Sequence, residues 1–171
     1  MPRKRTLWIT GPAIALALAL YAVFTGGIAI ADLVEAGVPI DGVGLQAHVM
    51  LEPPEQEVLQ GYIQSLVDLG LDVELTEMDV TKVALADELR RGTELFEAQA
   101  EVYRTMAAAC VAVYGCTGMT VWGVDDGRSW LDEQFPFDMD APNEPLLLDT
   151  ELAPKPAYRA IHEVLAGRIG D

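Results

Sequence analysis

Two short strand-like stretches, each apolar at its start and polar at its end, constrain most strongly what this chain can fold into. The first ends with Gln46 and His48, and the second ends with Glu77 and Asp79. Successive side chains on a strand point to opposite faces, so the members of each pair should share one face. A carboxylate on an otherwise apolar strand is costly to bury unless it has a partner or a function. The two stretches therefore predict neighbouring strands whose polar ends meet in one site.

A regular alternation of strand and helix patterns surrounds these two stretches. Strands are expected over residues 40–48, 71–80 and 118–124, and helical patterns cover residues 31–37, 54–70, 86–113 and 155–165. This rhythm predicts an α/β fold with a parallel sheet, built from about three β-α units. A complete eight-stranded barrel needs ~250 residues, so residues 32–171 are expected to form somewhat less than half of one.

The charge of the chain bears on its partners. The formal net charge is −16, and Arg3, Lys4 and Arg5 account for three of the eleven basic residues. Such a surface repels phosphate backbones, and no basic patch interleaved with aromatic residues appears, so we expect no nucleic-acid partner. The acidity is most simply a solvated face that resists aggregation.

Residues 7–31 carry no charge and follow the basic cluster, which is typical of an export signal or a membrane anchor. Small residues at positions 29 and 31 favour a cleaved signal, whereas the length exceeds the usual apolar core of a signal and suffices to span a bilayer of ~30 Å. A third interpretation is unrelated sequence joined to a truncated gene. We expect residues 1–31 to be a signal or anchor, residues 32–171 to be the folded domain, and the protein to be secreted or membrane-anchored.

Cys110 and Cys116 stand six residues apart, where the third helix should give way to the last strand. In an oxidising compartment this pair would close a small loop, whereas in the cytosol two buried free thiols would be favoured. No CxxC motif or Cys/His cluster indicates a metal site.

Four sequence blocks, in the same order, resemble the second half of glycoside hydrolase family 10, the retaining endo-1,4-β-xylanases on a TIM (β/α)8 barrel. The blocks are GVPIDGVGLQAH (37–48), LGLDVELTEMDV (69–80), ACVAVYGCTGMTVWGVDDGRSW (109–130) and PLLLDTELAPKPAY (145–158). The resemblance covers residues 31–167 and implies the C-terminal portion of that barrel, acting on xylan or xylo-oligosaccharides without a cofactor. An unrelated barrel enzyme that shares only the general pattern is the less favoured alternative.

The resemblance also implies roles for the four polar side chains. Glu77 would be the catalytic nucleophile, and an ionised carboxylate suits attack on an anomeric carbon. His48 would hydrogen-bond Glu77, Asp79 would hold the imidazole in place, and Gln46 would contact sugar hydroxyls. Taken alone, His48 reads as a satisfied core histidine, but its three polar neighbours favour the catalytic interpretation.

Two tryptophans complete the implied site. Trp122 and Trp130 resemble the two indoles that wall the family's sugar site next to the cleavage point, and pyranose C–H groups pack well on aromatic faces. The alternative for Trp122 is core packing on an apolar strand. Cys110 and Cys116 match a disulfide found in many family members.

One departure from the family is as informative as the match. The family's general acid is a Glu preceded by Asn on the fourth strand, whereas the only Asn here is Asn143, in a late loop before Glu144 and Pro145. Loss of leaving-group protonation typically costs ~10²–10⁴-fold in rate. The chain is therefore either part of a xylan-cleaving enzyme or a non-catalytic saccharide-binding or membrane-tethered remnant. Open edges of an incomplete barrel are also expected to favour self-association.

Overall fold

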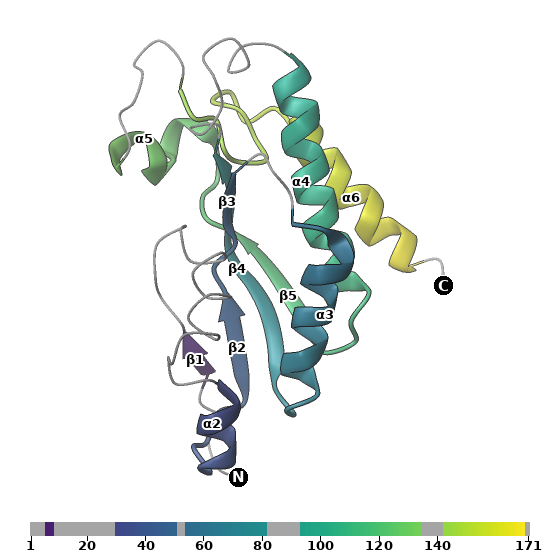
Figure 1. The fold of residues 1–171 in the computed structure, drawn as a ribbon. Coiled ribbons are helices and arrows are strands. Elements are labelled where there is room, and N and C mark those ends of the chain that lie inside the picture. Colours follow the sequence, from purple (N-terminus) through teal and green to yellow (C-terminus); the bar gives the residue numbers. More distant parts are fainter. Residues whose placement is uncertain (1–5, 9–29, 51–53, 82–92, 135–141, 170–171) are drawn as a thin grey trace.

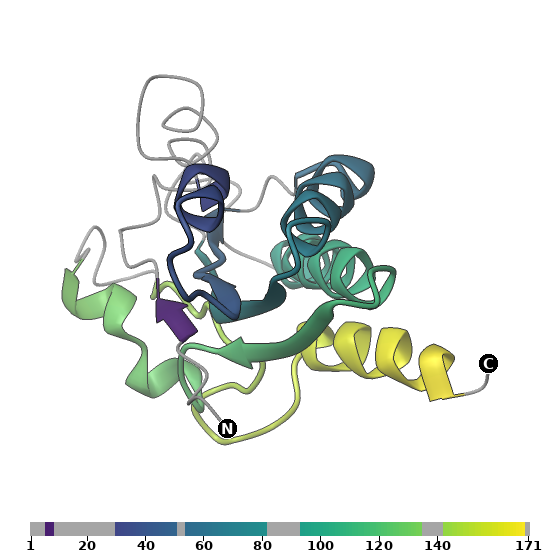
Figure 2. The same cartoon turned by 90° about the horizontal axis from the view of Figure 1, so that it is seen from below.

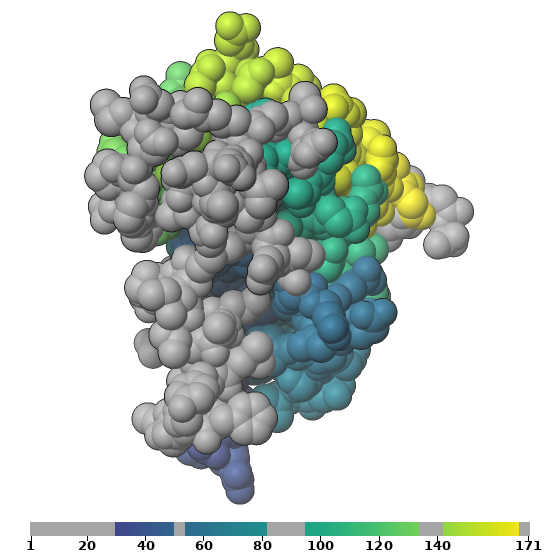
Figure 3. Space-filling model, turned by 45° about the horizontal axis from the view of Figure 1, so that its top comes forward, coloured from purple at the N-terminus to yellow at the C-terminus, as the bar shows by residue number. Residues whose placement is uncertain are grey.

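The computed structural model describes residues 6–8, 30–50, 54–81, 93–134 and 142–169. In this part of the chain, parallel strands form a twisted sheet, and α3, α4 and α6 lie side by side along one of its faces (Figure 1). Seen from below, the three helices follow the curve of the sheet (Figure 2). Their outer surfaces adjoin on one side of the molecule (Figure 3). The expected α/β architecture is confirmed.

The elements follow one another in an alternating order. The strands are β1 (Thr6–Trp8), β2 (Gly42–Leu45), β3 (His48–Met50), β4 (Asp72–Thr81) and β5 (Cys116–Val121). The helices are α2 (Ile30–Glu35), α3 (Gln56–Val67), α4 (Thr93–Val111), the 3₁₀ turn η2 (Asp126–Arg128), α5 (Trp130–Gln134) and α6 (Pro156–Ile169). The first residues of the helix expected over 86–113 lie outside the described residues.

The long strand β4 organises the sheet. It pairs in parallel with β2, β3 and β5, so its residues are covered on both edges, and Val73, Leu75 and Val80 are almost completely buried. Its sequence, DVELTEMDVT, alternates apolar and polar residues rather than forming the continuous apolar run of a strand that is apolar on both faces. Gly42 meets β4 closely, and a Cβ added there would stand 2.9 Å from the carbonyl oxygen of Asp72. Only glycine fits that approach without a shift of the backbone.

The core lies between this sheet and its helices. Its largest buried members include Ile63 on α3, Tyr103 and Met106 on α4, and Met78 on β4. Of the apolar positions expected at helical spacing on α3, Leu59, Ile63 and Leu66 are buried, whereas Val58 is 52% exposed. Gly37 and Gly70 end the preceding helical segments with positive φ angles of 74° and 84°, as their position after each helix predicts.

The expectation of one strand over residues 40–48 was wrong in detail. Ala47 has a φ of 59°, and this left-handed residue interrupts the extended backbone, so the strand becomes β2 and β3. The interruption brings His48 into register with Asp79 on β4. The expected strand over 118–124 is likewise shifted to β5, although the Trp122 N–H still donates to the Met78 carbonyl at 3.0 Å.

A strand that the sequence did not indicate, β1, pairs in parallel with β2, with Thr6 opposite Gly42. Residues 9–29, most of the apolar lead, lie outside the described residues, so the signal or anchor interpretation stays a prediction. Within the described ranges, no helix is both long and apolar enough to cross a membrane. In the same ranges β5 has β4 as its one strand partner, and self-association through open edges also stays a prediction.

Cys110 and Cys116 form a disulfide with a Cα–Cα distance of 5.3 Å. The bond joins the last turn of α4 to the first residue of β5, and both cysteines are buried. This outcome decides between the two interpretations of the pair in favour of the loop-closing disulfide.

Candidate active site

The polar ends of the strands meet around Glu77. The Gln46 amide donates to one carboxylate oxygen of Glu77 at 3.4 Å, and His48 Nε2 lies 3.2 Å from the other. Both partners come from the β2–β3 segment, which lies beside β4 in the sheet. The carboxylate is thus held on both oxygens, yet the side chain keeps 16% exposure, so one side of it stays accessible.

The backbone at Glu77 has an unusual conformation. Its φ is 59°, and the register between β4 and β5 shifts between Leu75 and Met78 at the same place. A non-glycine residue with positive φ costs of order 1 kcal/mol and persists where its surroundings fix it, often at functional sites. The expectation that Glu77 and Asp79 reach the same face is confirmed by their shared partner His48. Glu77 and Asp79 reach this face although the backbone of β4 is irregular at Glu77, and not through the regular alternation of side chains along an extended strand.

His48 bridges two carboxylates. Its Nδ1 lies 2.9 Å from Asp79 Oδ1, while its Nε2 faces Glu77. The Asp79 side chain is only 1% exposed, and its second oxygen accepts a hydrogen bond from Trp130 Nε1 at 2.7 Å. A chain of contacts therefore runs from Trp130 through Asp79 and His48 to Glu77.

Two opposing effects set the protonation of His48. Burial alone lowers its pKa, but hydrogen bonding and charge from Asp79, and then from Glu77, outweigh burial and raise the pKa above the ordinary 6.5. The imidazole therefore stays in its doubly protonated, charged form to higher pH than a free histidine does. In that form His48 donates to Glu77 and partly balances its charge.

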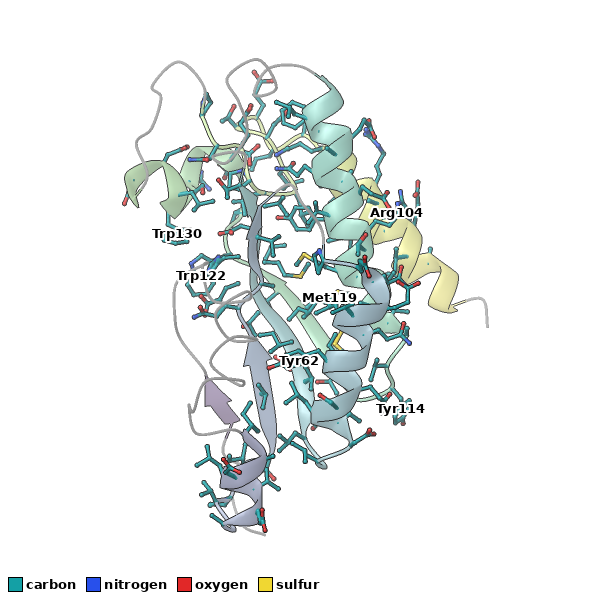
Figure 4. The ribbon with its side chains drawn as sticks, in the orientation of Figure 1. Tyr62, Arg104, Tyr114, Met119, Trp122 and Trp130 are labelled. Carbon is teal, nitrogen blue, oxygen red and sulfur yellow. A yellow bond between two sulfur atoms is a disulfide. The ribbon has the colours of Figure 1, made fainter. Side chains whose placement is uncertain are left out.

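The two predicted wall tryptophans lie beside this network. The His48 ring contacts Trp122 edge-on at 6.3 Å and Trp130 at 5.1 Å, measured between ring centroids. Figure 4 places both indoles on the side of the sheet away from α3, α4 and α6. Trp122 is 46% exposed, which excludes core packing, and Trp130 is half-buried. Together they present aromatic surface beside His48, the residue that contacts Glu77.

A buried ion pair that the sequence reasoning missed supports the loop carrying Trp130. Lys155 Nζ lies 2.8 Å from Asp126 Oδ2 and donates to the Glu144 carbonyl at 2.6 Å. The other oxygen of Asp126 accepts the Leu146 backbone N–H at 2.8 Å. These bonds tie the segment after β5 to the segment before α6. The available signal was a lone lysine between prolines and an aspartate pair that follows an apolar strand.

Asn143 belongs to the same scaffold. Its amide bonds Asp132 at 2.9 Å and accepts from the Thr81 hydroxyl at 2.8 Å. The carbonyl of Glu144 accepts from Gln99 and Lys155. Both residues therefore serve as loop anchors, which agrees with the expectation that this Asn-Glu pair is not the family's acid motif. Within the described ranges, no three His, Cys, Asp or Glu side chains are grouped to hold a metal ion.

Comparison with known proteins places this geometry in a family. The family model "Glycosyl hydrolase family 10" matches residues 27–164. Endo-1,4-beta-xylanase 5 of Pyricularia oryzae is 36% identical over 135 residues, which cover 78% of this chain and 31% of that protein. Endo-1,4-beta-xylanase 2 of Aureobasidium pullulans is 37% identical, over 73% of this chain and 35% of that protein. The chain thus spans about a third of the length of these curated relatives.

Solved structures agree with the sequence matches. Native xylanase 10B from Thermotoga maritima superimposes with a TM-score of 0.70 at 31% identity, over 82% of this chain and 41% of that chain. A xylanase10C mutant from Cellvibrio japonicus in complex with xylopentaose gives a TM-score of 0.74 at 29% identity, over 88% of this chain and 31% of that chain. The strands and helices described above correspond to part of those barrels. This chain belongs to glycosyl hydrolase family 10.

Proposed function

We propose that this chain carries the nucleophile side of a retaining endo-1,4-β-xylanase site, with Glu77 as the nucleophile. The observation that carries the proposal is the Glu77 carboxylate, held on both oxygens by Gln46 and His48 in a chain of this family. Retaining glycosidases need an ionised carboxylate that is fixed in place yet open on one side. Glu77 meets both conditions.

The first chemical step then follows from the geometry. One oxygen of Glu77 attacks the anomeric carbon, the bond from that carbon to the leaving oxygen breaks, and a glycosyl ester forms on Glu77. His48 and Gln46 hold the carboxylate so that attack needs little reorientation. Trp122 and Trp130 offer an aromatic wall for the sugar ring. The solved relatives hold ligands such as xylobiose and xylopentaose, which supports a xylo-oligosaccharide as the occupant.

The proton for the leaving oxygen must come from another carboxylic acid. Asp79 cannot supply it, because this side chain is 1% exposed and both of its oxygens face His48 or Trp130. Because Asp79 already has partners at both oxygens and cannot act as the acid, a second candidate function is favoured. In it, the chain binds saccharide through its tryptophans and does not cleave it.

We further propose that the protein acts outside the cytoplasm, as a secreted or membrane-anchored chain. The disulfide between Cys110 and Cys116 supports this location, because structural disulfides persist mainly in oxidising compartments. The proposal keeps residues 1–31 as signal or anchor and residues 32–171 as the barrel part.

A comparison of two substrates tests the function. A dinitrophenyl β-xylobioside has a leaving group that needs little protonation, so the full chain should release dinitrophenol. The family's acid also activates water in the second step, so release should stop after about one equivalent per chain. On xylan, where protonation is worth ~10²–10⁴-fold, no new reducing ends should appear.

Each other outcome has a clear meaning. Sustained cleavage of xylan by the purified chain would contradict the claim that its site lacks the general acid that xylan cleavage requires. Binding of xylobiose without any release of dinitrophenol would contradict the nucleophile assignment and support the saccharide-binding alternative.

A further inference from the structure

Trp130 makes a contact that a simple sugar wall does not require. Its indole N–H, the one hydrogen-bond donor of that side chain, points to Asp79 Oδ2 at 2.7 Å. The same carboxylate meets His48 Nδ1 through its other oxygen at 2.9 Å. Because the Asp79 side chain is 1% exposed, bulk water does not reach that oxygen while the indole is in place.

The structure also fixes Trp130 in this orientation. It is the first residue of α5, and the buried Ser129 just before it accepts the Leu131 backbone N–H at 3.2 Å. On the same helix, Asp132 accepts the backbone N–H of Asn143 at 3.0 Å. The first bond lies at the start of α5 and the second joins α5 to the segment at Asn143. Together they hold the backbone that carries the indole in place beside His48.

We propose that Trp130 is a positioning residue for Glu77, because its indole N–H holds Asp79 against His48, which in turn orients Glu77. The role of Glu77 in this statement rests on the function proposed above. The link from the indole to the imidazole does not, since it concerns contacts between side chains of this chain alone.

The physical consequence lies in the proton held by His48. A hydrogen-bond donor to a carboxylate stabilises the charged form of the carboxylate and makes it a weaker acceptor for other protons. Without the indole N–H, Asp79 would draw the His48 proton more strongly. The charged groups known to face His48 are Glu77 and Asp79, both on β4, while Trp122 and Trp130 bring no formal charge. The change should therefore appear as a higher pKa of His48.

Nuclear magnetic resonance of the full chain measures this directly, because the chain contains two histidines. His162 is exposed on α6, far along the chain from the site, and serves as the internal reference. In Trp130→Phe, the apparent pKa of His48 should rise by about half a unit to one unit, with His162 unchanged. Trp122→Phe is the matched control, since its ring also contacts His48, and it should leave the pKa of His48 within about 0.2 units.

A second pair of variants isolates the carboxylate. In an Asp79→Asn background the charge is gone, so adding Trp130→Phe should no longer raise the pKa of His48. An unchanged pKa in Trp130→Phe, an equal rise in Trp122→Phe, or a rise that persists with Asp79→Asn would each overturn the proposal.

A measurement on the unmodified chain keeps the test independent of folding in the variants. Of the three tryptophan indole signals, that of Trp130 should exchange its N–H with solvent at least tenfold more slowly than that of the exposed Trp122. Equal exchange of the two indole protons would contradict the hydrogen bond. Neither result depends on turnover, so failure of this proposal and failure of the xylanase function are distinguishable.

Discussion

Glu77→Ala is expected to remove glycoside cleavage, with release of dinitrophenol from the aryl xylobioside falling by at least ~10⁴-fold. The reason is chemical, because alanine cannot form the glycosyl ester. The fall should appear in the burst phase itself, measured by rapid-mixing absorbance with enzyme in excess. Azide, a small nucleophile that fits the space left by the carboxylate, should restore release in Glu77→Ala and leave the single-turnover release of the unmodified chain unchanged. With substrate in excess, azide should carry the unmodified chain past one equivalent, because it attacks the glycosyl ester without a base.

The same variant should fold normally. The Glu77 side chain is partly exposed, and alanine carries the same backbone cost at a φ of 59° as glutamate does. The free energy of unfolding should therefore change by less than about 1 kcal/mol, in either direction. Glu74→Ala is the matched control, since it removes a carboxylate from the same strand, beside Gly118 rather than beside His48, and should keep the burst. Loss of the burst in Glu74→Ala, or its survival in Glu77→Ala, would contradict the assignment.

The largest effect on stability is expected at Lys155. Lys155→Met should lower the free energy of unfolding by about 3–5 kcal/mol, because it leaves Asp126 charged and buried without its cation. It also removes the ammonium that lies 5.0 Å from the Phe96 ring centroid and bonds the Glu144 carbonyl. Chemical denaturation, monitored by tryptophan fluorescence, measures the change.

An exposed ion pair provides the control for the buried pair of Lys155 and Asp126. Arg104 and Glu163 form an ion pair of the same length, 2.8 Å, but their side chains are 39% and 61% exposed. Arg104→Met should therefore cost less than about 1 kcal/mol. Equal losses in the two variants would show that burial of the Lys155 pair is not the cause.

The pH dependence of Lys155→Met has a definite sign. Burial raises the pKa of Asp126 above 3.8, and Lys155 opposes that rise. Without the lysine, the carboxyl should hold its proton to still higher pH. The part of the penalty due to the unpaired charge is absent where Asp126 is protonated in both states. It sets in as pH rises above the ordinary 3.8 and levels off once pH passes the folded pKa. The loss in Lys155→Met should accordingly shrink on acidification toward pH 4.

The main elements could be predicted from sequence because each depends on local pattern. The alternating pattern from Leu71 to Val80 indicated the central strand, and the spacing of Leu59, Ile63 and Leu66 indicated α3. The polar ends of the strands indicated a site because parallel strands bring their carboxyl ends to one edge. The contacts of His48 with Glu77 and Asp79 follow the expectation, whereas the hydrogen bond from Gln46 to Glu77 was not expected, and the predicted contact of Gln46 with sugar hydroxyls stays a prediction.

What the sequence could not reveal depends on long-range packing. The positive φ angles at Ala47 and Glu77 arise where β2, β3 and β4 must fit together, and neither residue type signals such a conformation. The Lys155–Asp126 pair and the indole bond to Asp79 join residues 29 and 51 positions apart. Periodicity carries no information on such pairs. The strand β1 was missed because two of its three residues belong to the uncharged run that suggests a signal or an anchor.

The central claim is that Glu77 is the nucleophile, and mass spectrometry of the covalent intermediate tests it most directly. The full chain is incubated with a dinitrophenyl xylobioside in which fluorine replaces the hydroxyl at C2 of the xylose that carries the dinitrophenyl group. The fluorine slows hydrolysis of the ester. We expect one fluorinated xylobiosyl group per chain, located by peptide fragmentation on Glu77 and absent in Glu77→Gln. A label on another carboxylate such as Asp79, or an equal label in Glu77→Gln, would contradict the claim.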